Sequence, residues 1–395
     1  YCSEASLPTV FFWFDYLKTL KEKPLWNTET DPNINGGTSM SGYKTRGFCT
    51  VNSWLPIMFG GQANFYWHWR GHEAGHEIMH GSIVDSFGQP SYTHAEITRI
   101  AKDMAACSGF INGTKLQPSR IAIHYSAFAE KLFANQPVCS HPGYREVLNE
   151  YFYTPLIEAG LRVDVIAPDK ALDQYDIVIS PMLPNLDENE LKGRLLQWIE
   201  SGGTWIAGPL TDIRNIHCAK YDTPFSILEN WGGIKVKYFA APNPEHLFNL
   251  KYSDGTSSDS SLWYDGFENA GAVAIAVYSD SSYEFENLTA IAQNNKGNGK
   301  VITLGTLPPK AEFLKIVRSQ MKSRDDFSPS SSENVLCIPR KGEAGEGFIL
   351  AEYRNRPGTL ELPAQAIDLI TDIRYSGVVD IHPFTVMVMK YCNKN

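Results

Sequence analysis

The sequence predicts an α/β protein in three parts. Residues 1–117 form an incomplete (β/α) barrel, residues 118–327 a flavodoxin-like doubly wound domain, and residues 333–395 a small antiparallel β domain. Three observations support this division: strands that open into polar loops near the N-terminus, strand–helix–strand repeats in the middle, and short alternating apolar runs at the end. A length of 395 residues also suits two or three domains.

The first part has short apolar strands, each followed by a polar loop and a helix. In a (β/α) barrel, loops at the carboxyl ends of the strands carry the active site. About two strand–helix units fit before residue 115, and a closed barrel needs eight, so this part cannot close on itself. The predicted elements are a helix over 10–20, a buried strand over 24–27 entering the polar segment 28–37, a helix over 51–59, an aromatic strand over 64–70, and a charged loop over 71–80.

The second part repeats strands and helices at the spacing of a parallel, doubly wound sheet. Residues 144–156 have the spacing of a buried helix face, with a kink expected at Pro155, and the glycines at 202–203 should end a helix over 187–201. Residues 254–261 are predicted to be an exposed loop, and 328–332 a linker. The predicted strands are 119–125, 163–166, 176–180, 204–207 and 300–305.

The last part consists of short alternating runs separated by Gly and Pro, which is typical of a small antiparallel β domain. The predicted strands are 335–338, 348–353, 359–362 and 385–390.

Composition excludes several partners and cofactors. With 35 basic and 44 acidic residues, the chain lacks the positive charge that binds nucleic acid. No apolar run reaches the roughly 18–20 residues that cross a bilayer, so we expect no membrane association. The seven cysteines are scattered and never spaced C-x-x-C, which favours reduced thiols and a cytoplasmic location, although a leader could have been removed. We expect no metal and no cofactor.

One string invites a metal interpretation. His72-Glu73-Ala74-Gly75-His76 matches H-E-x-x-H, which in zinc hydrolases places two imidazoles one helical turn apart. Gly71 and Gly75 weaken the helix that this arrangement needs, and His80 lies too close for the usual third ligand. We therefore expect a polar loop here, and keep a zinc hydrolase as an alternative hypothesis.

Carboxylates offer a second interpretation. Glu29 directly follows a predicted strand, so its side chain should lie at the mouth of a cleft, with Asn27, Thr28 and Thr30 as hydrogen-bonding neighbours. Retaining glycoside hydrolysis uses one carboxylate as nucleophile and a second carboxyl about 5–5.5 Å away as acid and base. From the residues alone, a glutamate that follows a strand is far more often a solvated loop residue.

At this point the sequence resembles the family 42 glycoside hydrolases, which are β-galactosidases. Their nucleophile lies in a segment like K-x-K-P-F-L-L-M-E-S-T-P, and residues 21–32 here read K-E-K-P-L-W-N-T-E-T-D-P, which places Glu29 on the nucleophile. Their last barrel strand resembles F-Q-W-R, followed six residues later by E-K-F-H-G; residues 67–70 and 77–81 match without a gap. The resemblance implies that Glu77 and His80 bind hydroxyls of the terminal sugar. Trp67 and Trp69 would then wall the pocket.

The resemblance continues beyond the barrel. It implies that 118–327 is a trimerisation domain similar to class I glutamine amidotransferases, without a nucleophilic cysteine after the strand over 204–207. The family's acid/base glutamate follows an asparagine upstream of the nucleophile, yet no Asn-Glu pair precedes Glu29. The family's tryptophan after the nucleophile is replaced by Asn35-Gly36-Gly37. We therefore expect the barrel's acid/base half to be missing and these residues alone to be inactive.

Together these features predict a retaining glycoside hydrolase that releases terminal β-D-galactose from an oligosaccharide or a small β-glycoside and assembles as a homotrimer. Two alternatives remain open: a β-mannosidase of a related trimeric barrel family, and a non-catalytic assembly or sugar-binding protein.

Overall fold

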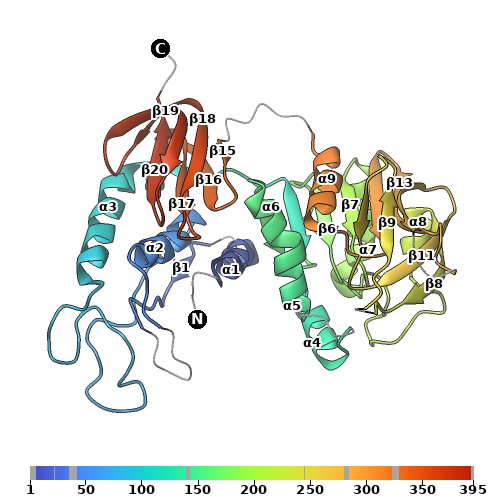
Figure 1. Ribbon diagram of the computed structural model, residues 1–395, viewed down its shortest axis with the longest axis horizontal. Helices are drawn as coiled ribbons and strands as arrows, with labels where there is room; N and C mark the ends of the chain where they lie inside the picture. Colours follow the sequence, from blue (N-terminus) through green and yellow to red (C-terminus); the bar gives the residue numbers. More distant parts are fainter. Residues whose placement is uncertain are drawn as a thin grey trace. The chain divides into compact units, whose positions relative to one another are not determined.

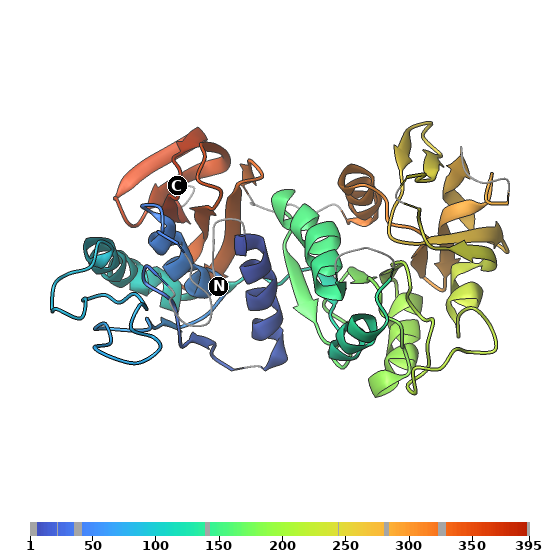
Figure 2. The ribbon, with the colours of Figure 1, turned by 60° about the horizontal axis from the view of Figure 1, so that its bottom comes forward.

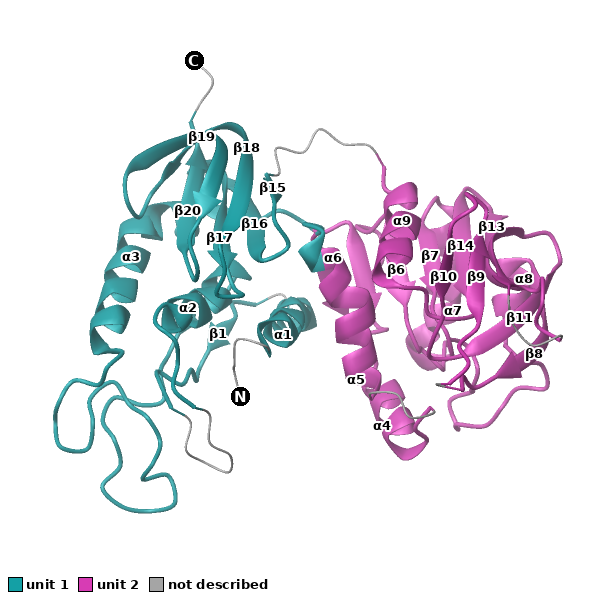
Figure 3. Cartoon of the chain, viewed as in Figure 1, with its two compact units in different colours: residues 1–118, 157–161, 324–395 teal, residues 119–156, 162–323 magenta. Residues whose placement is uncertain are grey.

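A computed structural model describes residues 6–21, 23–34, 42–138, 143–243, 245–279, 284–322 and 329–392. The chain divides into two compact units (Figure 3). Unit 1 comprises residues 1–118, 157–161 and 324–395, and unit 2 comprises residues 119–156 and 162–323. None of the described helices is long and apolar enough to cross a membrane.

The N-terminal part of unit 1 contains the two predicted strand–helix units. Strands β1 (Trp26–Asn27) and β2 (Ala63–Asn64) pair in parallel, with Asn27 opposite Asn64. The helices are α1 (Leu7–Leu20), α2 (Phe48–Met58) and α3 (His94–Asn112).

Both strands are shorter than the sequence suggested. The expected strand over 64–70 ends at Asn64, because the backbone of residues 68–71 hydrogen-bonds to residues 83 and 84 of the following loop instead of to a strand. The prediction of a buried strand at 24–27 was wrong: only residues 26–27 form a strand, and none of the four residues is buried. Trp26 is 58% exposed and contacts Phe65 at 5.9 Å between ring centroids.

The C-terminal part of unit 1 is an antiparallel sheet, as predicted, and it contacts α2 through β17 and β20 (Figures 1 and 2). Its order is β15-β18-β20-β17-β16-β3, with β19 on β18. Two residues of the expected linker form β15, which pairs with β18; residue 328 lies outside the described residues. The strands are β3 (Thr114–Leu116), β15 (Ser330–Ser331), β16 (Val335–Gly342), β17 (Gly345–Glu352), β18 (Gly358–Asp368), β19 (Ile373–Ile381) and β20 (Val386–Tyr391).

Unit 2 contains the predicted parallel sheet, in the order β5-β4-β6-β7-β14. The helices α7 and α8 cover one face, while α5, α6 and α9 lie on the other (Figure 1). The elements are β4 (Ile121–His124), α4 (Ala127–Asn135), α5 (Tyr144–Val147), the π-helix η2 (Leu148–Tyr153), α6 (Thr154–Glu158), β5 (Val163–Ile166), β6 (Ile177–Ser180), η3 (Glu188–Glu190), α7 (Leu191–Glu200), β7 (Thr204–Ala207), α8 (Leu228–Gly232) and α9 (Lys310–Gln320).

An antiparallel extension that the sequence analysis did not predict continues this sheet beyond β14. The expected exposed loop over 254–261 is partly wrong, because Ser257–Asp259 form a strand paired with β9, and Ser260 is buried. The added strands are β8 (Ile234–Ala240), β9 (Asn249–Tyr252), β10 (Ser257–Asp259), β11 (Tyr264–Asn269), β12 (Val273–Ser279) and β13 (Thr289–Lys296). In the sheet they follow β14 (Gly299–Leu304), the last strand of the predicted parallel part.

Candidate active site

The segment that carries Glu29 runs alongside the segment that follows β2. The backbone N–H of Phe65 donates to the carbonyl of Asn27, and that of Trp67 donates to the carbonyl of Thr30, both at 3.0 Å. Glu29 therefore lies at the carboxyl end of β1, beside the carboxyl end of β2, where a (β/α) barrel places its active site. The side chain of Glu29 is exposed.

The polar neighbours of Glu29 hold its main chain and one another. The side-chain amide of Asn27 donates to Thr30 Oγ1 at 2.6 Å, to Asn64 Oδ1 at 2.8 Å and to the backbone carbonyl of Glu29 at 3.2 Å. No hydrogen bond or ion pair joins the Glu29 carboxylate to another side chain in the described part of the chain. These neighbours fix the turn, while the Glu29 side chain is exposed.

The loop after β2 carries the other predicted residues. Trp67 is 42% exposed and Trp69 is 65% exposed, whereas His80 is only 7% exposed. The Glu77 carboxylate is half-buried and lies 3.6 Å from His72 Nε2. The loop thus presents two open aromatic rings beside a carboxylate and a buried imidazole.

Close backbone packing joins His80 to the Glu29 segment. The N–H of Gly81 donates to the carbonyl of Ile34 at 2.7 Å, and Asn33 Nδ2 donates to the carbonyl of Ser82 at 2.9 Å. A Cβ on Gly81 would lie 1.5 Å from Asn33 Oδ1, so only glycine fits here. The structure thereby brings together the two segments that hold Glu29 and His80.

His68 belongs to the same cluster and was not predicted as a site residue. Its ring centroid lies 4.4 Å from that of His72 and 5.5 Å from that of His80. Burial, with the nearby His72 and His80, lowers the pKa of His68, and its buried Nε2 has no hydrogen-bond partner in the described residues. The only sequence signal was its position in the W-H-W-R string, between two tryptophans already chosen.

The H-E-x-x-H string forms turns, not a helix. Gly75 has φ +97°, a left-handed conformation that interrupts any helix between the two histidines. The side chain of His76 is 86% exposed. Among the residues that the structure describes, three or more His, Cys, Asp or Glu side chains nowhere cluster in a way that could hold a metal ion.

The turn after β7, where the sequence predicted no nucleophilic cysteine, begins with a glycine. Gly208 follows β7, and a Cβ there would lie 2.7 Å from Pro181 Cα, so this turn has no room for a nucleophilic side chain. The nearby polar pair, His124 Nδ1 and Ser180 Oγ at 2.8 Å, is fully buried. Burial, followed by the charge of Arg194, lowers the pKa of His124 to about 3, so the imidazole stays neutral in the core.

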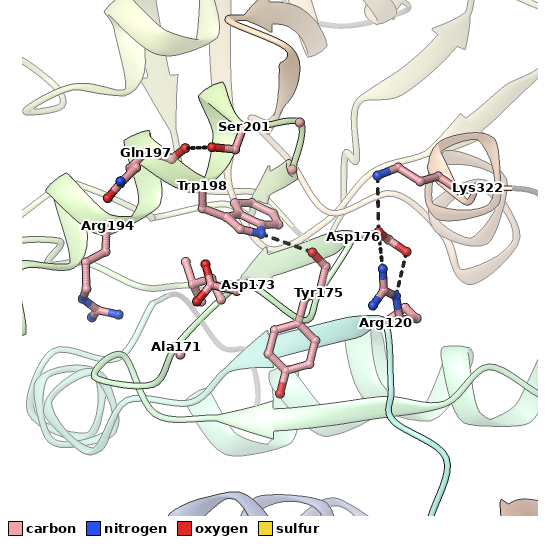
Figure 4. A pocket seen from close by; sticks show the side chains of 13 residues that line it. Arg120, Ala171, Asp173, Tyr175, Asp176, Arg194, Gln197, Trp198, Ser201 and Lys322 are labelled. Carbon is pink, nitrogen blue, oxygen red and sulfur yellow. Dashed lines mark hydrogen bonds and ion pairs between the residues drawn. The ribbon is translucent and has the colours of Figure 1, made fainter.

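A cleft of about 490 Å³ lies in unit 2 (Figure 4). Arg120 donates two hydrogen bonds of 3.0 Å to Asp176, and Lys322 lies 3.3 Å from the same carboxylate. Burial raises the pKa of Asp176, but the hydrogen bonds from Arg120 and Lys322 outweigh it and leave the pKa lowered. The charges satisfy one another, as expected of a structural cluster.

Comparison with known proteins defines the class. The family model described as "Beta-galactosidase trimerisation domain" matches residues 119–326, and that described as "Beta-galactosidase" matches residues 3–107. The chain belongs to the family 42 glycoside hydrolases.

Particular relatives agree with this assignment. The chain is 26% identical to β-galactosidase YesZ of Bacillus subtilis (strain 168) over 410 residues, covering 100% of this chain and 60% of the relative. β-Galactosidase YesZ of Bacillus licheniformis is also 26% identical, and the match covers 98% of this chain and 59% of the relative. The crystal structure of β-galactosidase from Bacillus circulans sp. alkalophilus has the same fold, with a TM-score of 0.90 and 17% identity. The match covers 98% of this chain and 58% of that structure's chain. The chain thus spans about 60% of the length of these curated relatives.

Proposed function

We infer that these residues are part of a retaining exo-β-galactosidase. Glu29 is the nucleophile that attacks the anomeric carbon, and Glu77 and His80 bind hydroxyls of the terminal galactose. Trp67 and Trp69 form the walls of the sugar pocket, and the acid/base carboxyl comes from outside these 395 residues. The observation that carries the proposal is the hydrogen-bonded contact between the Glu29 segment and the segments of Trp67 and Gly81.

The exposed and buried groups suit these roles. A covalent mechanism needs an accessible carboxylate at the strand end, and Glu29 is exposed there. Sugar hydroxyls both donate and accept hydrogen bonds. The Glu77 carboxylate and the His80 imidazole can therefore distinguish a sugar that has the matching hydroxyls from one that lacks these hydroxyls. The open faces of Trp67 and Trp69 offer apolar surface to a pyranose ring.

Unit 2 has a separate role in this proposal. Its match to a trimerisation domain supports an assembly function, and we infer a homotrimer. The doubly wound sheet then contributes subunit contacts and no chemistry of its own.

A substrate panel tests the activity. Nitrophenyl β-galactoside, β-mannoside, β-glucoside and α-arabinoside are supplied to the longest natural polypeptide that contains these residues, with its Glu29→Gln variant as the blank. The β-galactoside should give the highest kcat/KM. Preference for the β-mannoside would assign the related mannosidase activity instead. Equal rates in the variant would remove Glu29 from the mechanism.

A further inference from the structure

Besides the cleft in unit 2, the structure has a larger cleft of about 900 Å³ in unit 1. We call it the tyrosine cleft; it lies between the loops before α2 and α3, which include Tyr43 and Tyr92, and two loops of the C-terminal sheet, at 370–371 and 383–386. None of Glu29, Trp67, Trp69, Glu77 and His80 lines it. The cleft is therefore distinct from the proposed sugar pocket.

Two stacked tyrosines form one wall of this cleft. The rings of Tyr43 and Tyr92 lie 5.1 Å apart between centroids with an angle of 25° between their planes. Tyr43 is 74% exposed and Tyr92 is 50% exposed, so the pair keeps aromatic surface open to solvent. The backbone N–H of Lys44 donates to the Tyr92 hydroxyl at 3.2 Å, which fixes the orientation of that ring. A fixed, open aromatic surface suits the apolar face of a pyranose.

Part of the remaining lining is polar, with both signs of charge. The Glu96 carboxylate accepts hydrogen bonds from Thr50 N at 2.8 Å and Thr50 Oγ1 at 2.7 Å, and Arg99 donates to Thr50 Oγ1 at 2.9 Å. Arg99 also lies 3.8 Å from Asp103, Lys44 lies 2.7 Å from the Asp31 carboxylate, and Arg46 adds a further positive charge. Because most of these charges are paired, this part of the lining offers hydrogen-bond donors and acceptors to hydroxyl groups more than a net charge to an ion.

One buried donor in the lining is unsatisfied. Trp54 lines the tyrosine cleft and is completely buried, and its Nε1 has no acceptor in the described part of the chain. A buried donor without a partner costs about 1–3 kcal/mol, so native structures normally supply an acceptor, often a buried water, and this N–H is sensitive to changes in the lining around it.

From these contacts we propose that the tyrosine cleft binds a neutral oligosaccharide, with one pyranose stacked on the Tyr43–Tyr92 pair and its hydroxyls on the polar wall. The proposal does not depend on Glu29 chemistry, because binding here requires no hydrolysis.

The test uses β-1,4-galactotriose and the Glu29→Gln variant, so that no hydrolysis occurs. The indole N–H signal of Trp54 in a ¹H–¹⁵N spectrum reports on the cleft, and its shift on titration gives the dissociation constant. Tyr43→Ala should weaken binding at this signal about tenfold, because it removes stacking area. Tyr43→Phe, which keeps the ring, should stay within about twofold.

Tyr238→Ala is the matched control, since Tyr238 is also an exposed tyrosine (40%) but lies in unit 2. It should leave the titration unchanged. The proposal is overturned if the Trp54 signal does not move, if Tyr43→Ala titrates like its parent, or if trigalacturonate binds more tightly than the neutral trisaccharide. Failure of the Glu29 assays would leave this titration unaffected, so the two proposals fail separately.

Discussion

Asn27 and Asn64 are joined by a hydrogen bond of 2.8 Å across the paired strands β1 and β2, from the Asn27 amide to Asn64 Oδ1. Thr30 Oγ1 donates to the same oxygen at 2.7 Å. A single acceptor on β2 therefore holds both sides of the turn that carries Glu29. Such positioning matters for catalysis, because a reacting group displaced by about 1 Å can cost a hundredfold in rate.

Asn64→Ala should lower kcat/KM on nitrophenyl β-galactoside by about tenfold, since removing this acceptor releases the turn at a cost of about 1 kcal/mol or more. The far-ultraviolet circular dichroism spectrum should not change. Asn294→Ala is the control: its amide donates to the Trp231 carbonyl at 2.9 Å in unit 2, and its loss should not affect kcat/KM. An equal loss in both variants would show that Asn64 has no special role.

Gly81→Ala should abolish most activity, because the new Cβ would lie 1.5 Å from Asn33 Oδ1 and 2.6 Å from Ile34 N. Separating these segments displaces His80, so we expect at least about a hundredfold loss of kcat/KM. Gly109→Ala tests whether any added methyl group is harmful. Nothing lies within 4 Å of that position in α3, and the substitution should raise stability by about 0.5–1 kcal/mol. Full activity in Gly81→Ala would contradict the described packing.

Arg340→Met should destabilise unit 1 by about 3 kcal/mol, measured by urea unfolding. This guanidinium on β16 is only 4% exposed and donates to the carbonyls of Ile111 and Thr114 at 3.0 and 3.1 Å, at the end of α3. Burial lowers the pKa of Arg340 to about 10, so it remains charged at neutral pH. Arg374→Met, on the exposed face of β19, should change the unfolding free energy by less than about 0.5 kcal/mol. Similar unfolding free energies for the two variants would contradict a stabilising role for the hydrogen bonds from Arg340 to the end of α3.

Asp265→Asn should raise the Tm at pH 8 by about 4 °C or more and leave it unchanged near pH 4. Burial raises the pKa of Asp265 to about 7, despite the hydrogen bond from Trp263 Nε1. Between the usual carboxyl pKa and about 7 the folded protein keeps a proton that the unfolded chain releases, so stability falls as pH rises through this window. Differential scanning calorimetry across this range measures the difference. A constant offset at every pH would contradict the raised pKa.

Much of the fold could be predicted because local signals agreed with the final packing. The helix expected over 187–201 illustrates both the success and the limit. The N–H of Gly202 donates to the Ile199 carbonyl and that of Gly203 to the Trp198 carbonyl, as a glycine cap requires, and the helix ends at Glu200, one residue before the predicted end. Its start was wrong, because Asn189 and Glu190 have φ of 53° and 56°, which separates η3 from α7.

Other elements depend on partners far along the chain and gave no local signal. Ser330 and Ser331 form a strand only because residues 360–361 of β18 lie opposite them. For the same reason His68 was missed: its neighbours His72 and His80 come together only when the loop folds back on the Glu29 segment. The strand-end position of Glu29, in contrast, follows directly from the residues before it.

The nucleophile is tested most directly by covalent trapping. The longest natural polypeptide that contains these residues is incubated with 2,4-dinitrophenyl 2-deoxy-2-fluoro-β-galactoside, digested, and analysed by tandem mass spectrometry. We predict one fluorogalactosyl adduct, on Glu29, and none in Glu29→Gln. A label on another carboxylate, or an adduct that persists in the variant, would contradict the account.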